Sequence, residues 1–135
     1  MSSPIVPCLR YRNAPQMIEW LCENLGFTKH MIYPGENNTI AHAQLTLGSG
    51  MIMVSSITDT PFGKFLQDPA EIGGRETQCC FIQVQDVEHV YEKVVANGGK
   101  ILLPLKDQDY GSRDFTFSDP AGHIWSIGTY DPWKS

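Results

Sequence analysis

The stretch MIEWLCENLG at residues 17–26 has a counterpart 73 positions later, VYEKVVANGG at residues 90–99, and this recurrence decides the fold. Both copies place apolar residues at i, i+1 and i+4 before a glycine, the pattern of an amphipathic helix with a glycine stop. Strand patterns surround the two stretches in the same order. The sequence therefore predicts one structural unit built twice.

Alternating apolar residues predict the strands of each unit, and glycine or Asp-Pro turns separate them. The first copy reads as strand 5–11, a helix opened by Asn13 and closed at Gly26, and strands 27–33, 39–47 and 51–57. The second reads as strand 78–85, a helix over 87–97 that Asp86 caps, and strands 100–105, 113–117 and 123–129. The landmarks pair Gly26 with Gly99 and Gly50 with Gly122. Each copy is a βαβββ unit of the α+β class, and pairing two such units buries the faces that one alone leaves open.

The length of the chain limits the number of cores. With 135 residues, 41% of them hydrophobic, the chain is expected to form a single domain over residues 1–135. The half-repeats are then 1–57 and 76–130, and 58–75 is the linker between them. Aromatic side chains such as those of Phe62 and Phe65 are unusual in a segment that only connects two halves of a domain.

The charge and composition of the chain indicate which classes of binding partner to expect. The net charge is -5 and the basic residues are scattered, so no basic stripe is expected to bind nucleic acid. No apolar run reaches the length of a membrane span, and no signal segment is visible at the N-terminus. The four cysteines lack C-x-x-C spacing, which favours free thiols in a reducing compartment. We therefore expect a cytoplasmic protein that binds neither nucleic acid nor membranes.

Three stretches point to a known family. They are the segment 110–115 (YGSRDF), the turn and strand 119–125 (DPAGHIW) and the matching strand residues 42–45 (HAQL). Together with the duplicated βαβββ unit, they resemble the glyoxalase, bleomycin-resistance and extradiol-dioxygenase superfamily, also called the vicinal oxygen chelate superfamily. The resemblance implies a U-shaped mixed sheet around a central cleft and, often, a homodimer.

The same resemblance implies where metal ligands would lie. In the metal-dependent enzymes four ligands come from the first and fourth strands of the two halves, and here those positions fall on Val6, Val54, Cys79 and Ser126. Valine has no lone pair and a serine hydroxyl is a weak ligand, whereas catalytic sites need three or more His, Asp, Glu or Cys donors. The sequence thus predicts no metal and no other cofactor, and it favours the metal-free bleomycin-resistance-like branch.

Seven residues are the candidate ligand contacts. The strand phase assigned by the repeat, together with their position near the cleft, selects His42, Ile52, Val54, Phe81, Arg113, Ile124 and Ser126. Two of them have a structural alternative: His42 as a hydrogen-bonded strand residue and Arg113 as a partner of an acidic side chain. Asp119 is expected to bind backbone amides of its turn rather than to act in catalysis.

The predicted function is the binding of a small organic molecule, aromatic or cationic, sequestered in an apolar cleft without chemistry. Two alternatives stay open. One is a lyase, isomerase or dioxygenase of the same superfamily with atypical ligands, and the other is a non-catalytic interaction module.

Overall fold

The computed structural model describes residues 3–134, in two compact units that meet in the chain between Asp68 and Pro69. Unit 1 contains β1 (Cys8–Tyr11), α1 (Ala14–Leu25), β2 (Thr28–Pro34), β3 (Ile40–Leu47), β4 (Gly50–Ser56) and the short 3-10 helix η1 (Phe62–Phe65). Unit 2 contains the 3-10 helix η2 (Pro69–Ile72), β5 (Cys80–Gln83), α2 (Val87–Ala96), β6 (Lys100–Asp107), β7 (Arg113–Ser118) and β8 (Ile124–Gly128). The predicted α+β class and the two βαβββ modules are confirmed.

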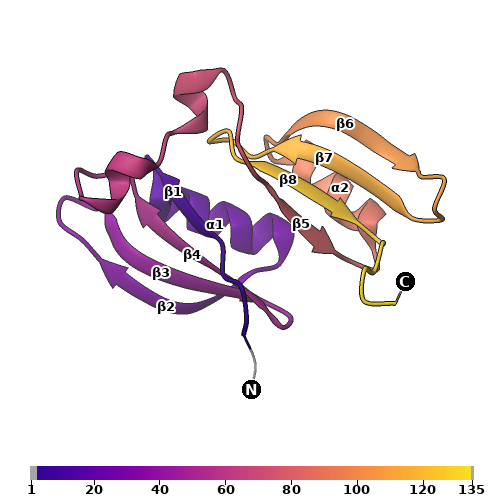
Figure 1. Ribbon diagram of the computed structural model, residues 1–135, viewed down its shortest axis with the longest axis horizontal. Coiled ribbons are helices and arrows are strands. Elements are labelled where there is room, and N and C mark those ends of the chain that lie inside the picture. The colour runs from indigo at the N-terminus through magenta and orange to yellow at the C-terminus, as the bar shows by residue number, and fades with distance from the viewer. Residues whose placement is uncertain (1–2, 135) are drawn as a thin grey trace. The chain divides into compact units, whose positions relative to one another are not determined.

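The two units have the same sheet topology. Unit 1 forms a four-stranded sheet in the order β1-β4-β3-β2, and unit 2 one in the order β5-β8-β7-β6. The first strand of each unit runs parallel to the fourth, and the other pairs are antiparallel. One helix covers one face of each sheet, as Figure 1 shows for α1 and α2. The opposite face, which we call the open face, is left for other contacts.

Helix α1 buries its apolar side against the sheet of unit 1. Met17, Ile18 and Leu21 are almost fully buried, and the helix contacts β4 and β1. The helix ends at Gly26, whose φ of 88° is a left-handed conformation that glycine adopts without a steric penalty. Asn13 stands at the N-cap, but its side chain makes no capping hydrogen bond, unlike Asp86 in α2, which accepts from the amide of His89.

Unit 2 has an aromatic core. Phe115 and Phe117 stack at a centroid distance of 5.6 Å, and Tyr91 of α2 meets Phe115 edge-on at 5.0 Å. Trp125, the cross-strand partner of Phe117, is fully buried beside them. Such aromatic contacts stabilise a core beyond the burial of their area.

Prolines account for two differences between predicted and observed strands. The first strand begins at Cys8 rather than at residue 5, and Pro7 contributes only its carbonyl, which accepts from the amide of Met53. Strand β6 continues past Pro104 to Asp107, with a register shift between Leu103 and Lys106. A proline is tolerated there because β6 is an edge strand and a bulge removes the need for its N–H.

The repeat contains two one-residue offsets. The left-handed glycine after the second helix is Gly98, not Gly99, so it is Gly98 that corresponds to Gly26. In the hairpins, Leu45 pairs with Ile52, whereas Phe117 pairs with Trp125, which leaves one more residue between the partners in unit 2. The predicted pairing of Gly50 with Gly122 ignores that extra residue.

This offset reverses the predicted phase of β4. Ile52 and Val54 are only 4% and 1% exposed and lie on the helix-covered face, whereas Met53 and Ser55 are half-buried on the open face. A slip of one residue moves every side chain of a strand to the other face. The structure therefore corrects the expectation that the side chains of Ile52 and Val54 face an open cleft.

Candidate ligand-binding site

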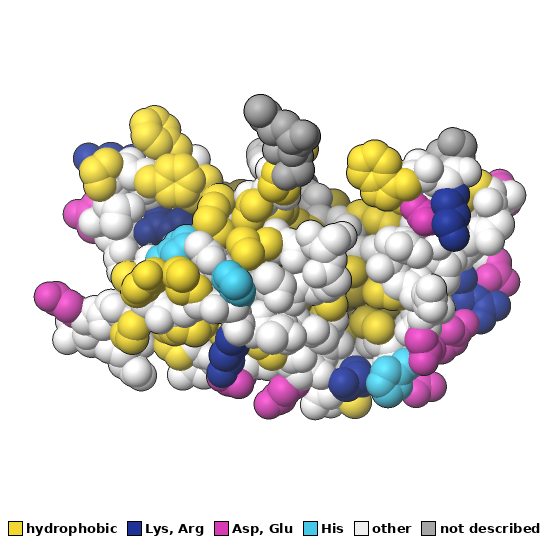
Figure 2. All heavy atoms as spheres, turned by 90° about the horizontal axis from the view of Figure 1, so that it is seen from below, with side chains coloured by type: hydrophobic (Ala, Val, Ile, Leu, Met, Phe, Trp, Pro, Cys, Tyr) yellow, Lys and Arg dark blue, Asp and Glu magenta, His cyan; other side chains and the backbone are white. Residues whose placement is uncertain are grey.

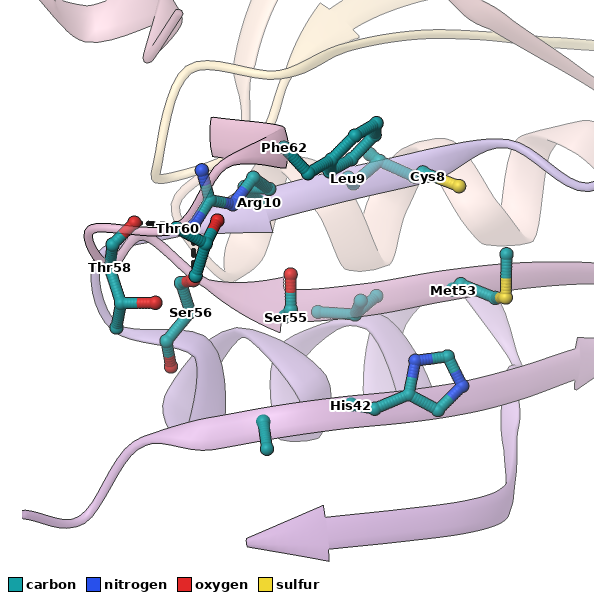
Figure 3. Close-up of a pocket in the computed structure, with 12 residues that line it drawn as sticks. Cys8, Leu9, Arg10, His42, Met53, Ser55, Ser56, Thr58, Thr60 and Phe62 are labelled. Carbon is teal, nitrogen blue, oxygen red and sulfur yellow. Dashed lines mark hydrogen bonds between the residues drawn. The ribbon is translucent and has the colours of Figure 1, made fainter. Parts of the chain in front are cut away.

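A pocket of about 370 Å³ lies on the open face of unit 1. Strands β1, β3 and β4 form its floor, and the segment from Thr58 to Phe62 forms one wall (Figure 3). The lining residues are Cys8, Leu9, Arg10, Ala41, His42, Met53, Val54, Ser55, Ser56, Thr58, Thr60 and Phe62.

Strand alternation explains which side chains reach the pocket. In β1, Leu9 and Tyr11 are buried on the helix-covered face, so Arg10 between them projects to the open face. In β3, Ala43 is fully buried and His42 before it is half-buried. Figure 3 shows Arg10, His42 and Ser55 on the same side of the sheet, with α1 behind it.

The guanidinium of Arg10 is held by backbone carbonyls. Its Nη2 donates to the carbonyl oxygen of Thr58 at 2.8 Å and to that of Ser56 at 3.2 Å. A Cβ at Gly63 would lie 2.1 Å from Nη1 of Arg10, so only glycine lets η1 approach this closely. The Gly63 amide is bound in turn by the hydroxyl of Thr60 at 3.0 Å.

His42 lies in a chain of polar and aromatic contacts along the open face. Its Nε2 is 3.1 Å from the side-chain amide nitrogen of Gln44, and its ring centroid is 6.4 Å from that of Tyr33 on β2. Figure 2 shows hydrophobic side chains gathered around histidine on the part of the surface that unit 1 forms. Met31 and Tyr33 of β2 are exposed, and Phe62 and Phe65 are exposed on η1.

The predicted site residues divide between the units. His42 and Val54 line the pocket of unit 1, although the side chain of Val54 is buried beneath the floor. Ile52 lies in the core. The other four, Phe81, Arg113, Ile124 and Ser126, belong to unit 2.

Phe81 and Ser126 are register partners on the open face of unit 2. Phe81 is 43% exposed, and the hydroxyl of Ser126 is hydrogen-bonded to that of Thr116 at 2.8 Å. Ile124 begins β8 and is half-buried, and its amide donates to a carboxylate oxygen of Glu76 at 3.0 Å. These residues remain predicted ligand contacts.

Arg113 takes the structural alternative that the sequence left open. Its Nε lies 2.7 Å from a carboxylate oxygen of Asp107, its cross-strand partner, and its Nη1 lies 2.6 Å from Glu88 of α2. Hydrogen bonding to this guanidinium holds the pKa of Asp107 below its usual value. The pKa of Glu88 is lowered first by a backbone hydrogen bond and then by Arg113.

This ion-pair cluster predicts a pH dependence of stability. Both carboxylates have a folded-state pKa below the unfolded one, so their contribution is present at neutral pH and is lost as the pH falls through the folded-state values. We expect the difference in unfolding free energy between the wild type and Arg113→Gln to shrink between pH 6 and about pH 3. Urea titrations at several pH values measure it. A constant difference would show that Arg113 acts through packing alone.

The turn before β8 is structural. One Asp119 carboxylate oxygen accepts from the amides of Ala121 and His123 at 3.1 and 3.0 Å, and the other accepts from the indole of Trp125 at 3.0 Å. The His123 ring is paired with Glu76. The predicted role of Asp119 in binding turn amides is confirmed.

The described residues do not fit a metal site. Val6 precedes β1 and is half-buried, Cys79 is exposed, and Ser126 is paired with Thr116. Within residues 3–134, no three His, Cys, Asp or Glu side chains are placed to hold one ion. Among these residues, no helix combines the length and the apolar character that crossing a membrane requires.

The cysteine side chains differ in burial, and this difference predicts the order in which an alkylating reagent modifies them. Burial raises the pKa of the Cys80 thiol to about 11, with smaller effects of Cys79 and Glu76, and burial also raises that of Cys22. Cys8 and Cys79 are exposed. Because the thiolate is the reactive form, iodoacetamide at pH 8 is expected to modify Cys8 and Cys79 first. Mass spectrometry of timed digests measures the order, and early labelling of Cys80 would contradict it.

The paired βαβββ modules define the class of protein to which this chain belongs. A family model matches residues 5–127, and the chain belongs to the Glyoxalase/Bleomycin resistance protein/Dioxygenase superfamily. An uncharacterised protein of Mycobacterium bovis is 27% identical over 95 residues, which are 70% of this chain and 62% of that protein. This chain thus spans less than two thirds of the length of that relative.

Solved structures agree with this fold. TioX from Micromonospora sp. ML1 matches with a TM-score of 0.69 and 26% identity over 94% of this chain and 98% of its own. The fosfomycin resistance protein FosX from Listeria monocytogenes matches with a TM-score of 0.72 over 99% of this chain and 98% of its own. At 14% identity, FosX supports the fold alone.

Proposed function

We propose that this chain is a small-molecule binding protein of the bleomycin-resistance-like, metal-free branch of the superfamily, and that it sequesters an organic ligand without chemistry. The observation that carries the proposal is the pocket of about 370 Å³ on the open face of unit 1. This volume falls within the range of about 300 to 1,000 Å³ typical of small-molecule sites. Met53 and Phe62 offer apolar contact, and His42, Ser55 and Thr60 offer hydrogen bonds.

The composition of the pocket favours binding over metal chemistry. Its lining holds one histidine and one cysteine, whereas a catalytic metal needs about three protein donors. Methionine and phenylalanine suit a flat or aromatic ligand, since the flexible thioether adapts to the shape of a ring.

A thermal-shift screen with metal analysis tests the proposal. Protein purified without a histidine tag is expected to contain no stoichiometric zinc, nickel, manganese or iron. Organic ligands, but not metal ions, are expected to raise the midpoint of unfolding, because a ligand that binds only the folded state stabilises it. One metal ion per chain, or stabilisation by metals alone, would instead favour the alternative function as a lyase, isomerase or dioxygenase. If no compound changes the midpoint of unfolding, the result would favour the alternative function as a non-catalytic interaction module.

A cytoplasmic homodimer completes the proposal. Phe62 and Phe65 are 56% and 84% exposed, and Trp133 is 92% exposed, which is more aromatic surface than a monomer usually leaves in water. Light scattering is expected to give twice the chain mass of 15.1 kDa. A mass near that of one chain at all working concentrations would reject the dimer.

A further inference from the structure

We propose a second binding site, on the open face of unit 2, in which the carboxylate of Asp114 binds the ammonium group of an organic cation. The pocket described above belongs to unit 1, so this site goes beyond the proposed function and does not rest on it. The sequence-based expectation of a cationic guest used only the net charge of -5. The contacts of Asp114 give that expectation a particular place in the fold.

Strand alternation puts Asp114 on the open face of β7. Its neighbours Arg113 and Phe115 both contact side chains of α2, so the side chain of Asp114 points to the opposite side of the strand. Its register partner on β8 is Gly128, where an added Cβ would come within 2.5 Å of the Cβ of Asp114. Only a glycine on β8 therefore lets Asp114 lie this close to the neighbouring strand.

The partners of the Asp114 carboxylate within residues 3–134 are neutral. The side-chain amide of Gln108 donates to Oδ1 at 2.8 Å, and the hydroxyl of Tyr110 donates to Oδ2 at 3.0 Å. Lys106 is the register partner of Asp114 on β6, but in this part of the chain it forms no ion pair with it. Each carboxylate oxygen has two acceptor positions, so one on each oxygen remains for a cationic donor.

A buried hydroxyl beside Asp114 adds an acceptor. Gln108 and Ser112 face each other in the turn that joins β6 to β7 (Figure 1), where the amide of Gln108 donates to the carbonyl of Ser112 at 2.7 Å. Opposed residues of a hairpin direct their side chains to the same face, which here is the face on which Gln108 binds Asp114. Ser112 is 6% exposed, and its hydroxyl makes no hydrogen bond to any residue that the structure describes. Such a group is uncommon, and it is able to accept an ammonium N–H.

Two tyrosine rings supply apolar contact. The rings of Tyr110 and Tyr130 meet edge-on, with their centroids 5.3 Å apart. Tyr110 is 62% exposed and its hydroxyl is bonded to Asp114, so a cation on this carboxylate lies beside an aromatic ring. Aromatic rings attract cations and also cover the carbon atoms that carry the charge. We therefore expect an ammonium group attached to an apolar body.

The groups around Asp114 suit an ammonium ion better than a metal ion. A hard cation such as calcium needs six or more oxygen ligands. Gln108 and Tyr110 instead direct an N–H and an O–H at the carboxylate, and these hydrogens occupy two of its acceptor positions. An ammonium group needs only one counter-ion and few acceptors, which this face of β7 provides.

Three aromatic probes of matched size test the site at neutral pH: cationic benzylamine, neutral benzyl alcohol and anionic benzoate. Each is titrated into the intact ¹⁵N-labelled protein, and amide shifts give both the site and the dissociation constant. Benzylamine is expected to shift the amides of Tyr110, Asp114 and Tyr130. It should bind there about three- to tenfold more tightly than benzyl alcohol, the scale of one partly exposed ion pair with a cation–ring contact. Benzoate should leave these amides unshifted, because it meets a like charge.

Variants identify the groups that bind the cation. Asp114→Asn removes the charge and keeps an acceptor oxygen, and it should lower the affinity for benzylamine to that for benzyl alcohol. Asp109→Asn removes the same charge from an exposed side chain of the same turn, so it is the matched control and should keep the preference. Tyr110→Ala should weaken both probes. In the wild type, intermolecular NOEs from the benzyl ring to Tyr110 and Tyr130 locate the probe, so the test does not depend on the folding of a variant.

Different outcomes separate this site from the proposed function. Equal affinity of the three probes at these amides, or an unchanged preference for benzylamine in Asp114→Asn, would overturn the ammonium site. Shifts of the same amides by calcium chloride at the probe concentrations would also overturn it. If benzylamine shifts only the amides of Ser55, Thr58 and Thr60, the ammonium site is rejected and the proposed function of the pocket is supported. If no probe shifts any amide, the ammonium site is rejected and the thermal-shift screen decides the proposed function separately.

Discussion

Asp119→Ala is expected to lower the free energy of unfolding by about 3 to 5 kcal/mol. The Asp119 carboxylate is 3% exposed and accepts from the amides of Ala121 and His123 and from the indole of Trp125. Alanine leaves these three donors without their acceptor, and each buried unsatisfied donor costs about 1 to 3 kcal/mol. Urea unfolding followed by tryptophan fluorescence measures the loss.

A graded series separates the bonds of Asp119 from its charge. Asp119→Asn keeps one acceptor oxygen and is expected to fall between the wild type and alanine. Asp109→Ala, at an exposed position of the same unit, is the matched control and should change the unfolding free energy by less than about 0.5 kcal/mol. A loss below about 1 kcal/mol in Asp119→Ala would show that water replaces the carboxylate and that the turn does not depend on it.

Ile52→Ala and Met53→Ala are expected to differ sharply, because the two neighbours lie on opposite faces of β4. Ile52 is 4% exposed and pairs with the fully buried Leu45, so its truncation leaves a cavity and costs about 2 to 5 kcal/mol. Met53 lies on the open face and lines the pocket, and its truncation should cost less than about 1 kcal/mol.

The same pair also differs in ligand binding. Met53→Ala should alter affinity for pocket ligands, whereas Ile52→Ala should alter stability alone. Thermal unfolding of both variants with and without a compound found in the thermal-shift screen measures the two effects. If Met53→Ala proves the more destabilising of the two, the assigned phase of β4 is wrong.

Most of the fold could be predicted from sequence because its signals are local. The two helices, their glycine stops and the order of strands follow from periodicity and turn residues within each unit. The phase of β4 could not be predicted from the repeat, because the number of residues between paired strand positions differs between the two units. Glycines mark the turns 48–50 and 119–122, but they do not show how many residues separate the paired strand positions.

The site was less accessible to sequence reasoning. The strand pattern predicts His42, and the linker composition points to Phe62, but neither pattern predicts that Arg10, Ser55 and Thr60 line the pocket. One local signal could have found Arg10, namely a charge between two buried residues of a short strand. Its carbonyl partners lie 46 and 48 positions away, so only the folded chain brings them together.

The unequal β3–β4 and β7–β8 turns show which parts of this architecture accept a change of length. Both units keep their core faces in phase although one turn holds an additional residue, because the burial pattern and not the turn sets the register. The exposed turn at Gly48 and Ser49, where no atom lies within 4 Å of a Cβ added at Gly48, is therefore a suitable point for inserting a labelling residue or short peptide tag. Such an insertion would report on unit 1 without displacing either face of its sheet.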